Sequence, residues 1–157
     1  MDSKEAKEFI SALEAELGSK IGYRTFATWF GSNDGLVREY GVFFCILEDG
    51  TLYFEDFERL PQILGYTLKS KNTPKYEKYS FRFRSDQIRS MSIVKKRQAQ
   101  QTCASASRVP LCTAGRLSQL LFPVVTQIEL DDGRCLYFEL ISHKEFTDAL
   151  KREEEKR

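Results

Sequence analysis

The side chains that could carry out catalysis are few and scattered in this sequence. The one histidine, His143, lies in a Ser-His-Lys-Glu segment, where helix capping predicts a solvated residue in the first turn. The four cysteines include no CxxC pair, and with a single histidine they cannot assemble a zinc site. The sequence contains no glycine-rich phosphate loop and no recognisable nucleophile–base pair. We therefore expect a protein that is not an enzyme and that holds neither a metal nor a cofactor.

The cysteines instead indicate where the chain resides. Cys45 and Cys135 lie in apolar, strand-like runs, whereas Cys103 and Cys112 lie in a polar stretch and are the thiols that we expect to be most exposed. Free thiols are typical of a reducing cytosol. No apolar run approaches the roughly 18 residues that a membrane-spanning helix needs, and we do not expect the polar N-terminus to act as a secretory signal. We expect a cytoplasmic protein that could also attach to a membrane surface.

Basic side chains are the clearest chemical feature, because they are unevenly distributed. The net charge is only +1, yet residues 66–97 contain ten basic and two acidic side chains, against six and twelve in residues 1–60. Such a block can mark an anionic partner, and the alternative is a solvated strand face flanked by loops. The ten residues are Lys69, Lys71, Lys75, Lys78, Arg82, Arg84, Arg89, Lys95, Lys96 and Arg97.

The periodicity of apolar residues predicts the elements that would position these groups. Residues 3–17 show helical spacing with an apolar stripe that ends at Gly18, and residues 142–152 predict a second helix with Phe146 on its inner face. The stretches 60–78 and 95–119 are predicted to be loops, the second long and mobile. Alternating or continuous apolar runs predict strands at 23–30, 41–47, 51–57, 79–84, 88–94, 124–130 and 135–141.

Two nearly identical phrases, "LEDGTLYFE" from Leu47 and "LDDGRCLYFE" from Leu130, predict two β-hairpins. In each phrase an Asp-Gly pair supplies the positive φ that a tight turn needs, and the aromatic run that follows suits a half-buried strand. Turn chemistry also explains the paired acids at both tips better than cation binding does. The segments around the two phrases differ, so a tandem duplication is not expected.

The order of these elements resembles that of pleckstrin homology (PH) domains. "GVFFCILEDGTLYFED" resembles their second and third strands, and "SFRFRSDQIRSMSIV" resembles their middle strands. "VTQIELDDGRCLYFEL" followed by "SHKEFTDALKRE" is similar to their last hairpin and closing helix, although Phe146 stands where that helix usually has Trp. The resemblance implies a mainly β (α+β) fold: a seven-stranded antiparallel barrel or sandwich capped by a C-terminal helix. It spans residues 21–152, after an extra N-terminal helix in residues 1–20 and before a charged tail in residues 153–157.

The resemblance also implies where an anion would bind. PH domains hold phosphoinositide headgroups against basic residues of the first two strands, and the matching residues here are Arg24 and Arg38. The family's Lys-x(n)-Lys/Arg-x-Arg pattern is absent, which argues against tight headgroup recognition. The candidate lipid- or anion-binding residues are therefore Arg24, Arg38, Lys69, Lys71, Lys75, Lys78, Arg82 and Arg84.

The sequence leaves several functions open. We favour a non-catalytic adaptor or scaffold module that binds a protein partner at an open strand edge or in a groove beside its closing helix, with the N-terminal helix either covering such a surface or binding the partner itself. The alternative is a targeting domain that binds phosphoinositide or an anionic membrane. A histone- or nucleic-acid-associated module is favoured less, because Phe81 and Phe83 alternate with Arg82 and Arg84 and so face away from them. An enzyme or lipid-pocket protein that uses the barrel interior would need a deep polar cavity.

Overall fold

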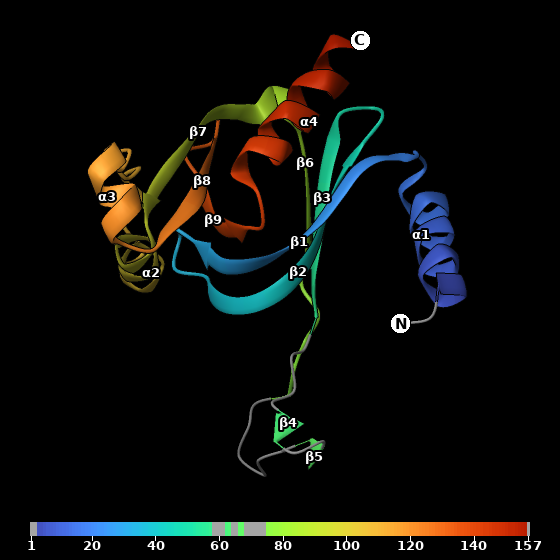
Figure 1. The fold of residues 1–157 in the computed structure, drawn as a ribbon, viewed down its shortest axis with the longest axis horizontal. Helices are drawn as coiled ribbons and strands as arrows, with labels where there is room; N and C mark the ends of the chain where they lie inside the picture. The colour runs from blue at the N-terminus through green and yellow to red at the C-terminus, as the bar shows by residue number, and fades with distance from the viewer. Residues whose placement is uncertain (1–2, 58–61, 64–65, 68–74, 157) are drawn as a thin grey trace.

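The computed structural model describes residues 3–57, 62–63, 66–67 and 75–156, and its centre is one curled antiparallel sheet (Figure 1). Seven strands follow the order β6-β3-β2-β1-β9-β8-β7, which confirms the predicted fold class. A separate two-stranded ladder joins β4 (Gln62–Ile63) to β5 (Tyr66–Thr67) within the stretch expected to be a loop. The sheet strands are β1 (Ile21–Ser32), β2 (Val37–Leu47), β3 (Thr51–Phe57), β6 (Ser80–Arg84), β7 (Ile88–Lys95), β8 (Val124–Leu130) and β9 (Cys135–Leu140).

The two Asp-Gly hairpins form as predicted. In the β2–β3 turn, Asp49 Oδ1 accepts a hydrogen bond from the Thr51 amide at 2.9 Å, and Gly50 adopts a φ of 74°. In the β8–β9 turn, Asp132 Oδ1 accepts one from the Arg134 amide at 2.9 Å. Each aspartate thus accepts a hydrogen bond from a backbone amide of its own turn, which explains why the same sequence motif occurs twice.

The concave side of the sheet encloses the main core. Phe44, Phe54 and Phe138 are fully buried there, and α4 (His143–Glu155) lies across the opening. Phe146 from α4 is also fully buried, with its ring centroid 4.9 Å from that of Phe44. The Ser142 hydroxyl accepts a hydrogen bond from the Glu145 amide, so the predicted cap begins this helix. Closure by α4 therefore depends on an aromatic anchor placed one turn inside the helix.

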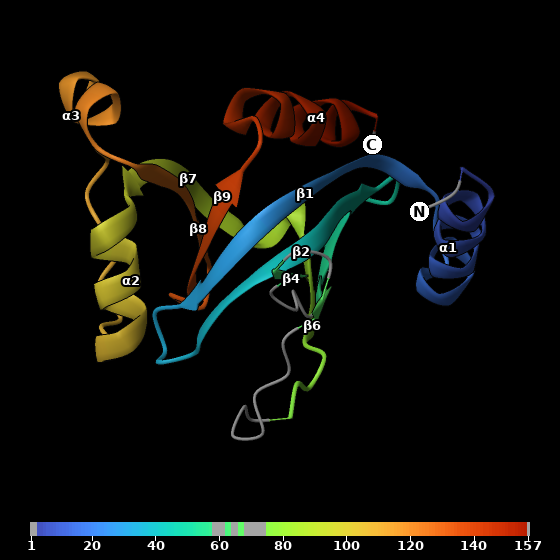
Figure 2. The ribbon, with the colours of Figure 1, turned by 60° about the horizontal axis from the view of Figure 1, so that its bottom comes forward.

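The convex side is covered in part by α1 (Ser3–Leu17), at one end of the molecule (Figure 2). Leu13 and Leu17 pack against Phe43, Cys45 and Leu47 on the outward face of β2. This strand is apolar on both faces because one face lines the concave core and the other lies against the helix. The helix, its bounds and its apolar stripe agree with the sequence prediction.

The prediction of a long mobile loop at 95–119 is wrong over much of its length. The segment contains α2 (Lys96–Ser105) and α3 (Arg116–Leu121), as well as connecting turns. Ala99 and Cys103 of α2 are fully buried in a second apolar cluster with Phe30, Val94 and Tyr137 among its members. Few of the residues in α2 are apolar, so its amphipathic character becomes visible only against the sheet that it covers.

The described residues contain no helix that is both long and apolar enough to cross a membrane.

Candidate functional site

A largely apolar groove opens on the convex face of the sheet, beside α1. Its volume is about 570 Å³, within the range of about 300–1,000 Å³ that is usual for ligand pockets. Phe26 is 54% exposed, although its ring lies 5.7 Å from that of Phe43 and 6.1 Å from that of Phe57. The helix contributes Ala6, Phe9 and Ile10 to the lining, and the strands contribute Arg24, Phe26, Phe43, Glu55 and Phe57.

Strand register explains why these side chains meet. Phe26 of β1 lies opposite Phe43 of β2, and Phe43 lies opposite Glu55 of β3, so one row crosses three strands. Since side chains alternate between faces, all members of this row point outward together. Phe9 of α1 forms one side of the groove, with its ring centroid 5.4 Å from that of Phe43 in an edge-to-face contact. The result is an aromatic floor that α1 leaves partly open.

Two charged side chains in the described part of the chain line the groove: the carboxylate of Glu55, which is paired, and the guanidinium of Arg24. Glu55 Oε2 accepts a hydrogen bond from the Tyr53 hydroxyl at 2.8 Å and pairs with Lys78 Nζ at 2.7 Å. Burial, followed by the hydrogen bond to Glu55, raises the pKa of Tyr53 and keeps its hydroxyl a donor. Arg24 is exposed, and no ion pair links it to another described residue. Among the described residues that line the groove, Arg24 is therefore the cation without a carboxylate partner.

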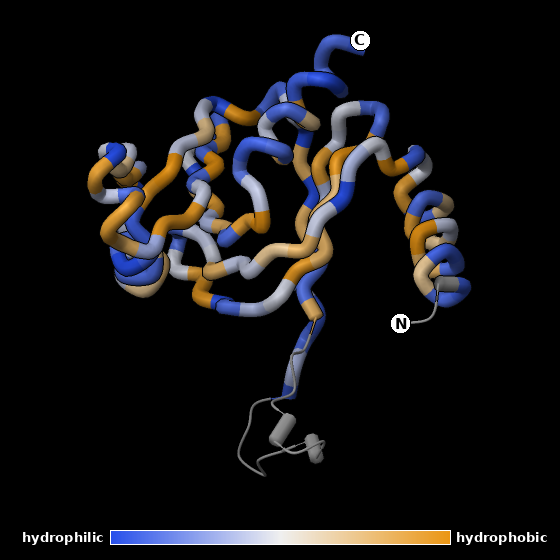
Figure 3. The backbone as a smooth tube through the Cα atoms, in the orientation of Figure 1, coloured by the Kyte–Doolittle hydropathy of each residue, from blue (hydrophilic) through white to orange (hydrophobic). Residues whose placement is uncertain are grey.

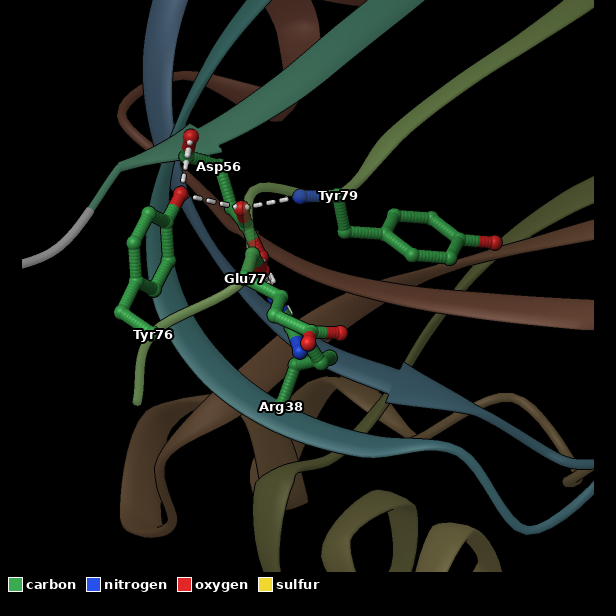
Figure 4. A network of polar contacts seen from close by, with 5 residues as sticks. All are labelled: Arg38, Asp56, Tyr76, Glu77 and Tyr79. Atoms are coloured by element: carbon green, nitrogen blue, oxygen red, sulfur yellow. Dashed lines mark hydrogen bonds and ion pairs between the residues drawn. The ribbon is translucent and has the colours of Figure 1, made fainter. Parts of the chain in front are cut away.

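Arg38, the second residue that the PH resemblance assigned to anion binding, belongs to a polar network (Figure 4). Its Nε donates to Asp56 Oδ2 at 3.0 Å, and its Nη2 donates to the Glu77 carbonyl at 2.8 Å. Asp56 Oδ1 accepts from the Tyr76 hydroxyl at 2.6 Å and from the Tyr79 amide at 2.8 Å. The Asp56 side chain is fully buried, so this network ties the end of β3 to the chain that enters β6.

The remaining candidate anion ligands do not converge. Lys75 is exposed, Arg84 pairs with Asp86 at 3.1 Å, and Lys69 and Lys71 lie outside the described residues. Arg82 is exposed on the outward face of β6, as the alternation of that strand predicted.

Arg24 and Arg82 occupy one row of the convex face, and the register places them three strand spacings apart. The separation between these two backbone positions is about 14 Å. Cys45 and Tyr53, which contact α1, lie between them. The structure thus brings Arg24 and Lys78 to the groove rim, and it leaves the other described basic residues elsewhere.

His143 and Cys103 are placed differently from the sequence prediction. His143 is half-buried, with Nδ1 2.8 Å from the Thr126 hydroxyl, and this burial lowers its pKa. Cys103 is fully buried rather than exposed, and burial raises its pKa to about 12. Cys112 is exposed as expected. Among the described residues, no group of three or more His, Cys, Asp or Glu side chains lies close enough to hold a metal.

Sequence reasoning missed the groove, although a signal for it was present. In "YRTFATWF", Phe26 has the same alternation as Arg24 and Thr28, so a large aromatic ring stands where a half-buried strand usually exposes a polar group. Phe57 has the same outward position at the end of β3. Aromatic residues on the outward faces of β1 and β3, on either side of β2, would have predicted either a covering helix or a docking surface.

The fold and the groove define a class of protein: an antiparallel half-barrel closed by a C-terminal helix, in a strand order compatible with a PH-like fold. No protein-family model matches the chain, and neither a curated protein nor a solved structure matches it significantly. The function is therefore inferred from the geometry of the residues themselves.

Proposed function

We propose that this chain is a non-catalytic, PH-like interaction module that acts as an adaptor or scaffold by binding a segment of a protein partner in the convex groove. The observation that carries the proposal is the exposed Phe26 ring on an aromatic floor between α1 and the sheet. Exposed aromatic side chains in a concave site are typical of the residues that dominate binding energy at protein interfaces.

The lining also indicates what the bound segment would contain. Phe26, Phe43 and Phe57 favour one or two apolar side chains of the partner, because burial of such groups supplies most of the binding energy. Arg24 at the rim favours an acidic residue next to them, since it has no carboxylate partner among the described residues. The preferred partner is an acidic-apolar peptide segment.

The structure offers less support for recognition of a headgroup by the candidate basic residues. Arg38, Lys78 and Arg84 already pair with Asp56, Glu55 and Asp86. An anion would have to compete with those carboxylates, and Cys45 and Tyr53, which pack against α1, lie between Arg24 and Arg82. We rank phosphoinositide binding by these residues second, and association with histones or nucleic acid third.

The test is selection of peptides from a random library on the wild-type chain, followed by measurement of their affinity for Phe26→Ser. The matched control is Phe122→Ser, because Phe122 is 52% exposed and Phe26 is 54% exposed. We expect acidic-apolar peptides that lose at least about tenfold in affinity for Phe26→Ser and nothing for the control. Peptides that bind both variants equally would refute the groove as the docking site.

A further inference from the structure

A second apolar surface lies at α3, at the end of the molecule opposite α1 (Figures 1 and 2). Leu117, Leu120, Leu121 and Phe122 are 75%, 82%, 73% and 52% exposed, and α3 buries none of its own residues. Single exposed apolar residues are normal, but four on six consecutive positions form a patch. Figure 3 shows hydrophobic residues in α3, where the tube projects from the sheet. We call these four residues the α3 patch.

Basic residues lie beside the α3 patch. Lys95 Nζ lies 5.0 Å from the centroid of the Phe122 ring, and the Lys96 amide donates to the Pro123 carbonyl at 2.9 Å. The junction of β7 and α2, which includes Arg97, therefore lies beside the end of α3. Arg116 begins α3 itself, and both Arg97 and Arg116 are exposed.

The sequence around the patch is also free of acids. Between Asp86 and Glu129 the chain has six basic residues and no acidic residue. Two of the six are neutralised from neighbouring strands, because Lys96 pairs with Glu139 at 3.0 Å and Arg89 pairs with Glu129 at 3.6 Å. Four basic residues remain without an ion pair to another described residue: Lys95, Arg97, Arg108 and Arg116. Arg108 lines a separate pocket with Asp34 and Asp132, so the cations beside the patch are Lys95, Arg97 and Arg116.

We propose that the α3 patch inserts into the interfacial region of an anionic phospholipid bilayer, with the neighbouring lysine and arginine side chains on the headgroups. A short helix with leucines on its surface and cations beside it has the composition of an interfacial membrane element. Six residues of helix are about 9 Å long, too short to span the bilayer, so α3 would lie in the interfacial plane with its apolar side chains buried by about 5–10 Å. The cations beside the patch that lack an ion pair to a described residue, Lys95, Arg97 and Arg116, favour a continuous anionic surface over a protein of mixed charge.

This inference goes beyond the proposed function and uses none of the groove residues. The groove includes Phe9 and Phe26, which lie on α1 and β1, whereas the α3 patch adjoins β7 and α2. A module with both surfaces would hold its protein partner at one end while the other end rests on the membrane. A negative result for peptide binding in the groove therefore leaves the membrane proposal standing, and a negative result with vesicles leaves the groove proposal standing.

The first experiment is sedimentation of the full chain with phosphatidylcholine vesicles that contain or lack phosphatidylserine. The wild type is expected to bind only the vesicles with phosphatidylserine. Leu120→Ser combined with Leu121→Ser should lower that partitioning by about tenfold or more. These side chains are exposed, so the fold should survive; thermal unfolding of each variant checks this. The matched control, Phe26→Ser, should bind as the wild type does.

A second experiment separates insertion from adsorption by charge alone. Phe122→Trp places a tryptophan in the α3 patch, and vesicles with brominated acyl chains should quench it, whereas the fully buried Trp29 of the wild type should be unaffected. Arg97→Gln with Arg116→Gln should weaken binding most at low salt. The proposal is overturned if the wild type does not bind at low salt, if the leucine variant binds normally, if binding ignores phosphatidylserine, or if bromine does not quench.

Discussion

The replacement Asp56→Asn tests whether the Arg38 network stabilises the fold. The Asp56 side chain is fully buried, and that of Arg38 is only 18% exposed. Asparagine keeps the shape and can still accept hydrogen bonds from Tyr76 and Tyr79, but it leaves the guanidinium buried without a counter-charge. Loss of one partner from a buried pair costs about 3–5 kcal/mol. Because some water reaches Arg38, we expect a loss near the lower limit, about 3 kcal/mol in the free energy of unfolding.

The assay is urea denaturation at pH 7, followed by the fluorescence of the single tryptophan, Trp29, which is fully buried. For a chain of this size the loss corresponds to a fall in melting temperature of about 6–12 °C. Asp86→Asn is the matched control, because its ion pair with Arg84 is exposed and should contribute less than about 1 kcal/mol. If Asp56→Asn lowers the free energy of unfolding no more than Asp86→Asn does, the network is not a stabilising element.

Three further predictions test the fold. Gly31→Ala should lower the free energy of unfolding by at least about 2 kcal/mol, because a Cβ at its φ of 125° would lie 1.9 Å from the Leu36 carbonyl oxygen. At Gly133 the φ is also positive, but no atom of the described residues beyond its chain neighbours lies within 4 Å of the added Cβ, so Gly133→Ala should lower it by about 1 kcal/mol in urea denaturation. Burial lowers the pKa of His143 below the unfolded value of about 6.5. As the pH falls through that value, the unfolded state binds a proton before the folded state does, so the free energy of unfolding should decrease. His143→Gln removes this proton uptake and should make the decrease smaller in thermal melts at several pH values. An alkylating agent should label one thiol in the native chain, and Cys112→Ser should abolish that labelling, since Cys112 is the exposed cysteine of the four. Rapid labelling of Cys103 would contradict the burial of α2.

The sequence alone was sufficient for elements whose causes are local. Both Asp-Gly turns, the Ser142 cap and the apolar stripe of residues 3–17 depend on residues within a few positions of one another. The alternation of Phe81 and Phe83 with Arg82 similarly predicted which side of β6 faces solvent. These signals specify the hairpins and both terminal helices, and their order along the chain specifies the fold class.

Only the tertiary structure could show which side chains are buried and which partners they contact. Arg38 meets an acid 18 positions away, and Phe26 joins the groove through its register with Phe43 and through contact of Phe9 with that ring. The polar segment that forms α2 buries Cys103 because a sheet assembled from distant strands lies under it. Local propensity acts over a turn or a hairpin, whereas burial and ion pairing depend on which strands become neighbours. The sequence thus determined the elements, and their register decided which arginine is structural, which thiol is buried and where a groove remains open.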